Sequence, residues 1–252
     1  MPFVCNYCKG VFCADHRLPE FHNCEKLDVV RVPGLIKKNN LSLIKGKTRS
    51  LHRSGRIEIQ NLLIAWLVLS FCFSLRFFWG ALSFFPQIFI ISLSTAGIGF
   101  IIHELMHKFS AQRYGHWAEF RVWPLGLVMA LIISIASAGN FIFAAPGATY
   151  ILPRSHTWSA EVDKKQNAFI SLAGPLSNAV LALLFYILML SSTTYWPWFI
   201  GWMGLQVNLW LAAFNMIPFG NIDGRKIYSW SSIVWALVAI PLWLGVFVLF
   251  FA

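Results

Sequence analysis

The sequence predicts an all-α polytopic membrane protein, with about five to six transmembrane helices and one re-entrant or sheet-like element, preceded by a small cytosolic zinc-finger module. Three observations lead to this fold class. The chain has 252 residues, of which 58% are hydrophobic and only 12% charged, and this is too apolar for a soluble domain. The apolar residues gather in six long stretches. Four of the five cysteines fall within the first 24 residues, among histidines.

The N-terminal residues 1–25 are predicted to form the zinc-finger module. No secretory signal peptide is expected, because Met1 leads straight into a cysteine-rich segment without an apolar core. The N-terminus should therefore stay in the cytosol, where thiols are kept reduced and bind metal rather than form disulfides. A module this small buries little, so a structural zinc ion would supply its folding free energy. The candidate ligands are Cys5, Cys8, Cys13, His16, His22 and Cys24.

Residues 26–56 form a basic juxtamembrane linker. They hold nine of the twenty lysines and arginines in a chain of net charge +10. Attraction to anionic lipids and the excess of basic residues in cytosolic loops explain this charge, so we expect no nucleic-acid partner. The module ahead of the linker is expected to dock a cytosolic protein or to regulate access to the rest of the chain.

The membrane-embedded domain is predicted over residues 57–252. A helix needs about 20 residues to cross the hydrocarbon core of a bilayer, and five apolar stretches fit one crossing each. The stretch 122–152 is broken by glycine and proline, and basic residues flank it on both sides. It is therefore expected to make no net crossing. The six stretches are 59–79, 84–107, 122–152, 167–190, 197–217 and 230–252.

The second apolar stretch ends in HELMH, residues 103–107. On a helix this spacing puts His103 and His107 one turn apart on one face, as zinc ligands require. Ionisable groups within a membrane segment are costly and usually functional. With a carboxylate as third ligand, zinc would keep one position for water, and Glu104 is placed to take the proton of that water. The alternative is a pair of histidines on a helix face near the interface.

The segment FNMIPFGNIDGRKI, residues 214–227, offers the third ligand. Its proline and glycines must end or unwind a helix, and broken backbone at membrane depth is tolerated where it lines a wet cavity. Asp223 lies in this break at the predicted depth of His103, and Asn215 could hydrogen-bond freed backbone groups or a substrate carbonyl. An ordinary helix end with an interfacial aspartate is the alternative. Of the ten acids, Glu104 and Asp223 are the two most closely tied to apolar segments.

The segment SLAGPLSNAV, residues 171–180, carries small residues at helix-packing spacing. Close helix packing is the favoured interpretation of this segment. Its polar residue Asn178 is a second candidate for substrate binding.

These motifs together resemble the site-2 protease family of intramembrane zinc metalloproteases, over roughly residues 57–252. The resemblance implies that His103, His107 and Asp223 hold a catalytic zinc ion and that Glu104 is the catalytic base. It also implies a substrate that is itself a transmembrane helix, and a sheet-like element after the HExxH helix that matches residues 118–152. The motifs are HExxH at 103–107, GPxxN at 174–178 and NxxPxxxxDG at 215–224.

The N-terminal segment is similar to the later part of an AN1-type zinc finger, with the first ligand pair missing. The crossed pairing of that family implies one zinc site, made by Cys5, Cys8, His22 and Cys24. Cys13 and His16 remain alternative ligands.

The leading interpretation is a zinc endopeptidase that cleaves transmembrane segments of other proteins, with membrane lipids and a cytosolic partner of the finger as further contacts. A substrate helix must unwind before cleavage, and an exposed strand edge near AEFRVW, residues 118–123, is expected to hold it by strand addition. A non-catalytic adaptor is the alternative, but it needs no general base such as Glu104. A zinc or proton transporter would need polar groups towards both faces, whereas here they cluster at one side.

Overall fold

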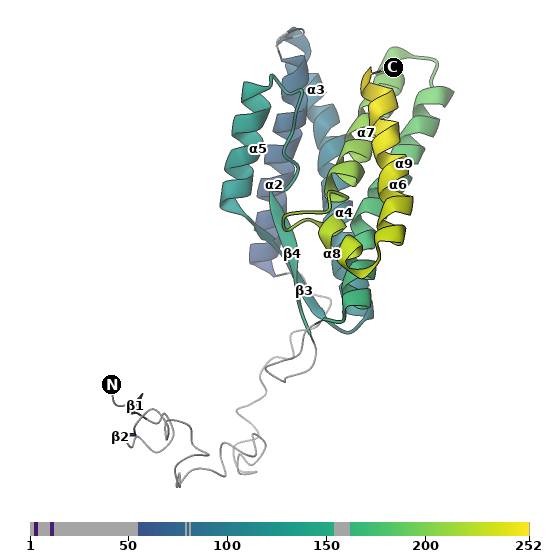
Figure 1. The fold of residues 1–252 in the computed structure, drawn as a ribbon. Helices are drawn as coiled ribbons and strands as arrows, with labels where there is room; N and C mark the ends of the chain where they lie inside the picture. Colours follow the sequence, from purple (N-terminus) through teal and green to yellow (C-terminus); the bar gives the residue numbers. More distant parts are fainter. Residues whose placement is uncertain are drawn as a thin grey trace, which may run out of the picture. The chain divides into compact units, whose positions relative to one another are not determined.

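The computed structural model describes only part of the chain (Figure 1), namely residues 3–4, 11–12, 55–78, 80, 82–153 and 162–251. The chain divides into two compact units, Met1–Ser50 and Leu51–Ala252. In the first unit, β1 (Phe3–Val4) pairs antiparallel with β2 (Val11–Phe12). Outside the described residues lie most of the linker and all six candidate finger ligands: Cys5, Cys8, Cys13, His16, His22 and Cys24.

The second unit is a helical bundle that also contains one β-hairpin. Figure 1 shows α4 running between α2 and α5 on one side and α6, α7 and α9 on the other. A short π-helical turn, η4 (Leu93–Gly97), joins α3 to α4. The helices are α2 (Arg56–Ser74), α3 (Phe85–Ser92), α4 (Ile98–Arg113), α5 (Pro124–Ala136), α6 (Lys164–Ser191), α7 (Tyr195–Asn215), α8 (Asp223–Trp230) and α9 (Ser232–Phe251). The 3-10 turns η2 (Leu75–Phe77) and η3 (Leu82–Phe84) lie between α2 and α3.

Four stretches of the described chain are long and apolar enough to cross a membrane, against the five to six expected. The helix α7 has 21 residues but is not apolar enough to be counted among them, because it carries Gln206, Asn208 and four tryptophans. The helix α5 has only 13 residues. The four stretches are Arg56–Phe77, Leu82–Arg113, Lys164–Ser191 and Ser232–Leu249.

The region after α4 is a β-hairpin with a helix inserted in it, which confirms the predicted sheet-like element. The strand β3 (Trp117–Val122) pairs antiparallel with β4 (Gly147–Leu152), and Val122 lies opposite Gly147. The connection runs along α5 and returns through a turn at Gly139, whose φ is +75°. The two strands that flank this connection therefore lie side by side, with Val122 opposite Gly147 and Trp117 opposite Leu152.

Close packing holds the bundle together, as expected where lipid removes most of the hydrophobic drive for helix association. On α7, a Cβ atom at Gly204 would lie 2.3 Å from the Phe185 ring of α6. A hydrophobic core between the hairpin, α4 and α2 includes one residue from each: Phe120, Phe100 and Leu69. This packing leaves the hairpin and α8 at the same end of the bundle as the C-terminal half of α4 (Figure 1).

Candidate metal centre

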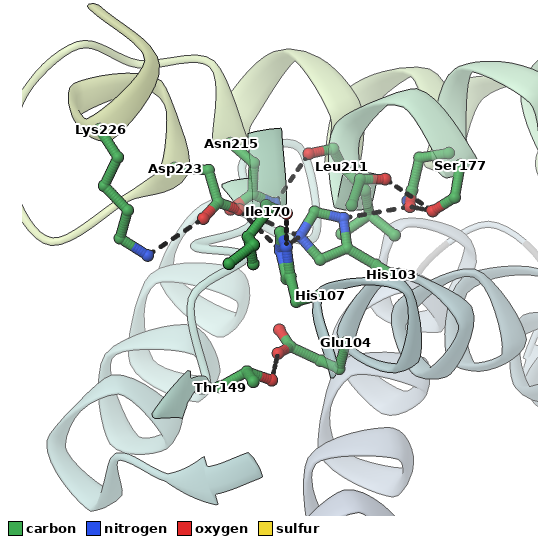
Figure 2. Close-up of polar contacts among 12 residues, drawn as sticks. His103, Glu104, His107, Thr149, Ile170, Ser177, Leu211, Asn215, Asp223 and Lys226 are labelled. Atoms are coloured by element: carbon green, nitrogen blue, oxygen red, sulfur yellow. Dashed lines mark hydrogen bonds and ion pairs between the residues drawn. The ribbon is translucent and has the colours of Figure 1, made fainter. Parts of the chain in front are cut away.

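Three ligating side chains from two distant segments meet at this end of the bundle. The Nε2 atoms of His103 and His107 lie 3.0 Å apart, and Asp223 Oδ2 lies 3.4 Å and 2.9 Å from them. All three residues are buried, and they form the cluster of potential metal ligands found in the described part of the chain. Figure 2 shows both imidazoles turned towards the carboxylate. The predicted ligands are therefore brought together.

Local sequence explains this convergence. His103 and His107 are one turn apart on α4. Between α7 and α8 the helix is interrupted, as predicted, and α8 begins at Asp223 itself. Gly224 allows the start of α8 to press against the end of α7, because a Cβ atom there would lie 2.3 Å from the Met216 carbonyl carbon.

Hydrogen bonds on the far side of each imidazole fix which ring nitrogen faces the centre. His103 Nδ1 donates to Asn178 Oδ1 at 3.2 Å, and His107 Nδ1 donates to the Ile170 carbonyl at 2.8 Å. Such partners orient metal-binding histidines in proteins generally. Each Nε2 atom is therefore turned towards the other and towards the Asp223 carboxylate, as ligands of one shared metal ion would be.

The spacing fits zinc. Ligand atoms about 2.1 Å from a tetrahedral ion lie about 3.4 Å apart, and the three distances here run from 2.9 to 3.4 Å. Two imidazoles and one carboxylate form a common catalytic zinc set, which keeps one position open.

Asp223 is held in the ionised form that a metal ligand needs. Burial alone would raise its pKa, but the charges of His107 and Lys226 and hydrogen bonds from both histidines hold the pKa well below the usual value. Lys226 Nζ contacts Oδ1 at 3.3 Å, whereas the histidines face Oδ2. The ammonium group of Lys226 thus pairs with Oδ1, and Oδ2 is the carboxylate oxygen placed to bind the metal.

Glu104 lies beside the ligand cluster rather than within it. The residue is 8% exposed, and its Oε2 accepts a hydrogen bond of 2.8 Å from Thr149 Oγ1 on β4 (Figure 2). Glu104, His107, Thr149, Asn215 and Asp223 line a common cavity of about 40 Å³. A substrate group and a water molecule can meet there between the base and the ligands.

The two candidate substrate-binding residues have different positions. Asn215 lines the cavity, and its Nδ2 donates to the Leu211 carbonyl. Asn178 is fully buried, and its Oδ1 accepts the hydrogen bond of His103 Nδ1. Its predicted contact with substrate is therefore corrected: it orients a candidate metal ligand instead. The GPxxN motif indicated a polar group in a packed helix but not the direction in which it points.

Sequence analysis missed three supporting groups: Thr149, the Ile170 carbonyl and the ion pair of Glu58. Glu58 is 1% exposed and contacts Lys108, so it is tied to an apolar segment as closely as Glu104 and Asp223, which were predicted to be the two most closely tied. Lys108 is buried as well. The sequence signal that could have revealed this ion pair is Glu58 itself, an acid in the first turn of an apolar helix.

Comparisons with known proteins agree with the site. The chain is 42% identical over 197 residues to the protein named "Putative zinc metalloprotease MJ0611" of Methanocaldococcus jannaschii, covering 77% of this chain and 94% of that protein. It is 28% identical over 175 residues to "Putative zinc metalloprotease YwhC" of Bacillus subtilis, covering 60% of this chain and 72% of that protein. No solved structure gives a significant match.

The N-terminus has relatives of its own. Residues 1–29 match the AN1-like zinc finger family. Over 31 residues the chain is 45% identical to "AN1-type zinc finger protein 1" of Mus musculus, which is 12% of each chain. Zinc is therefore the cofactor indicated by the relatives and by the ligand set alike. With its four apolar helices and these relatives, this membrane protein belongs to the site-2 protease family of zinc metalloproteases and carries an AN1-type zinc finger at its N-terminus.

Proposed function

We propose that the chain is an intramembrane zinc endopeptidase that hydrolyses peptide bonds in the transmembrane segments of other proteins. The observation that carries this proposal is the position of Glu104, a buried carboxylate beside the ligand set His103, His107 and Asp223. This centre lies on a helix long enough to cross a membrane. An adaptor would need no general base at such a place.

The residues divide the chemistry between them. Zinc, when bound, supplies Lewis-acid polarisation of a carbonyl and makes a water molecule acidic near neutral pH. Glu104 accepts the proton of the water whose oxygen adds to the peptide carbonyl carbon, and it returns a proton to the amine nitrogen as the C–N bond breaks. Thr149 holds one oxygen of Glu104, so the other is directed to the proton. Asn215 lines the space where the carbonyl would lie.

We infer a topology with the N-terminus, the metal centre and α8 on the cytosolic side. Residues 26–56, which end at the first residue of α2, carry nine basic residues, while α8 carries Arg225 and Lys226 and α6 begins at Lys164. The helices α2, α4, α6, α7 and α9 would then each cross once. The finger, with one structural zinc ion, would dock a cytosolic protein partner.

The strand edge that would hold an unwound substrate is that of β4, not that of β3 as the sequence had suggested. The outer edge of β3 faces α2, where the Phe120 N–H donates to Glu58 Oε1 at 3.1 Å. The alternation of an antiparallel ladder leaves the backbone groups of Gly147, Thr149 and Ile151 pointing away from β3. All three residues line the cavity with Glu104. A substrate strand added there would pass the catalytic base.

Replacing Ile151 by Pro tests this edge. Proline removes one outward N–H donor without removing a ladder bond to β3, so we expect the KM for a reporter substrate with one transmembrane helix to rise about tenfold. The matched control is Ile151→Ala, which shortens the side chain but keeps the N–H and should leave the KM nearly unchanged. Equal kinetics for Pro and Ala would place the substrate elsewhere.

Removal of zinc tests the function itself. The full-length protein, purified in detergent, should lose cleavage of the same reporter on chelation and regain it when zinc is restored. In parallel, His103→Ala should contain less zinc per chain than wild type, whatever zinc the finger holds. Cleavage that survives chelation, or equal zinc in the variant, would contradict the metalloprotease and favour the adaptor.

A further inference from the structure

One carboxylate at the start of α2 ties together three elements of the fold. Glu58, in the first turn of α2, is 1% exposed, and its Oε2 accepts a 2.6 Å hydrogen bond from Lys108 Nζ on α4. Its Oε1 accepts the N–H of Phe120 on β3 at 3.1 Å. Lys108 is 4% exposed and directly follows the metal ligand His107 in sequence. Two charges in such a setting are costly to bury, so the pair is weak as a source of stability.

The contacts of the hairpin show what this pair can do. Phe120 on β3 lies directly opposite Thr149 on β4. Phe120 is bound through Glu58 to Lys108, and Thr149 is bound directly to Glu104. Glu104 and Lys108 are four residues apart and so lie one turn apart on α4. Phe120 and Thr149, which lie opposite each other in the hairpin, are thus both linked to α4. Phe120 is linked through Glu58 to Lys108, and Thr149 is linked to Glu104, one turn earlier.

This two-point attachment limits the motions open to the hairpin. A single contact between Thr149 and Glu104 would leave the hairpin able to pivot about that bond. The second attachment, through Glu58, opposes the pivot, because it holds the backbone of the opposite residue. The cavity-facing edge of β4 moves with the same strand pair, so its distance from the metal ligands depends on both attachments.

We propose that Glu58 and Lys108 are positioning residues, which fix the β3–β4 hairpin against α4 and thereby set the place of Thr149, the catalytic base and the strand edge. The proposal rests on the proposed function for its kinetic consequence. A misplacement of catalytic groups by about 1 Å costs up to about 100-fold in rate, so loss of the anchor should lower kcat about 10- to 100-fold. Neither residue contacts the metal ligands' binding atoms, so zinc should stay bound.

The decisive comparison uses two double variants that both lack the buried charges. Glu58→Gln with Lys108→Met keeps a side-chain oxygen that can accept the Phe120 N–H. Glu58→Leu with Lys108→Met does not. We expect the Leu/Met protein to show the loss in kcat and faster amide hydrogen exchange in the hairpin peptides, with the zinc content of wild type. The Gln/Met protein should recover most of the kcat and of the hairpin protection.

The charge-swapped protein, Glu58→Lys with Lys108→Glu, separates positioning from simple charge pairing. It restores an ion pair but offers no acceptor to Phe120, so it should behave like Leu/Met. Recovery of wild-type kcat and exchange in the swap would overturn the proposal, as would equal behaviour of the two double variants or loss of zinc in Leu/Met. Hydrogen exchange and zinc content are measured without any substrate. They therefore test the anchor even if the proposed protease activity fails.

Discussion

Replacing Glu104 by Gln is expected to abolish cleavage while leaving zinc in its site. The amide cannot accept a proton, and the loss of a general base costs about 10²- to 10⁴-fold in rate. The shape of the site should survive, because the side-chain oxygen of glutamine can still accept the hydrogen bond of Thr149. The three ligands are untouched, since Glu104 is not one of them.

The measurement is kcat on the single-helix reporter together with zinc per chain. Asp163→Asn serves as the matched control, since it is the same acid-to-amide change at an exposed residue that caps α6. Asparagine caps helices about as well as aspartate, so this variant should retain its activity. Activity close to wild type in Glu104→Gln would show that another group takes the proton.

Replacing Gly174 by Ala is expected to empty the metal site. A Cβ atom at this position would lie 2.4 Å from His107 Nε2 and 2.6 Å from His103 Nε2, within the space of the two ligand atoms. The imidazoles must turn away, and their bonds to Asn178 and the Ile170 carbonyl would break with them. Alanine favours a helix interior over glycine by about 1 kcal/mol, so α6 itself should not be weakened.

Zinc per chain and cleavage should both fall in Gly174→Ala to the values of His103→Ala. Gly245→Ala in α9 is the matched control, because its Cβ would meet only the end of the Leu209 side chain, at 3.1 Å. That variant should keep its zinc. A Gly174→Ala protein with the zinc content of wild type would mean that the histidines do not hold the metal through these nitrogens.

The candidate metal ligands could be predicted from the sequence because each one lies in a short motif that can be recognised locally. His103 and His107 share one helix face, and the break around Asp223 is visible in its proline and glycines. The hairpin was predicted less directly, from basic residues on both sides of an interrupted apolar stretch and from the family resemblance. Its strands pair at a separation that local patterns do not encode.

The groups that support the ligands could not be predicted for the same reason. Thr149 and Glu58 are ordinary residues in sequence, and their roles come from partners 45 and 50 residues away. Asn178 was assigned to the substrate because helical spacing leaves open which neighbour a polar side chain meets. Four stretches of the described chain are long and apolar enough to cross a membrane, whereas α5 is shorter and α7 more polar than the expected spans.

The division of the metal site between α4 and α8 has a consequence for how the protein is made. His103 and His107 leave the ribosome long before Asp223, because α5, α6 and α7 lie between them in the chain. During most of synthesis the membrane therefore holds a histidine pair that lacks its carboxylate. The three-ligand site can therefore be completed with zinc only after α4 to α7 have been made and α8 has begun. On the proposed function, a nascent chain halted before α8 would lack the carboxylate ligand and would be inactive.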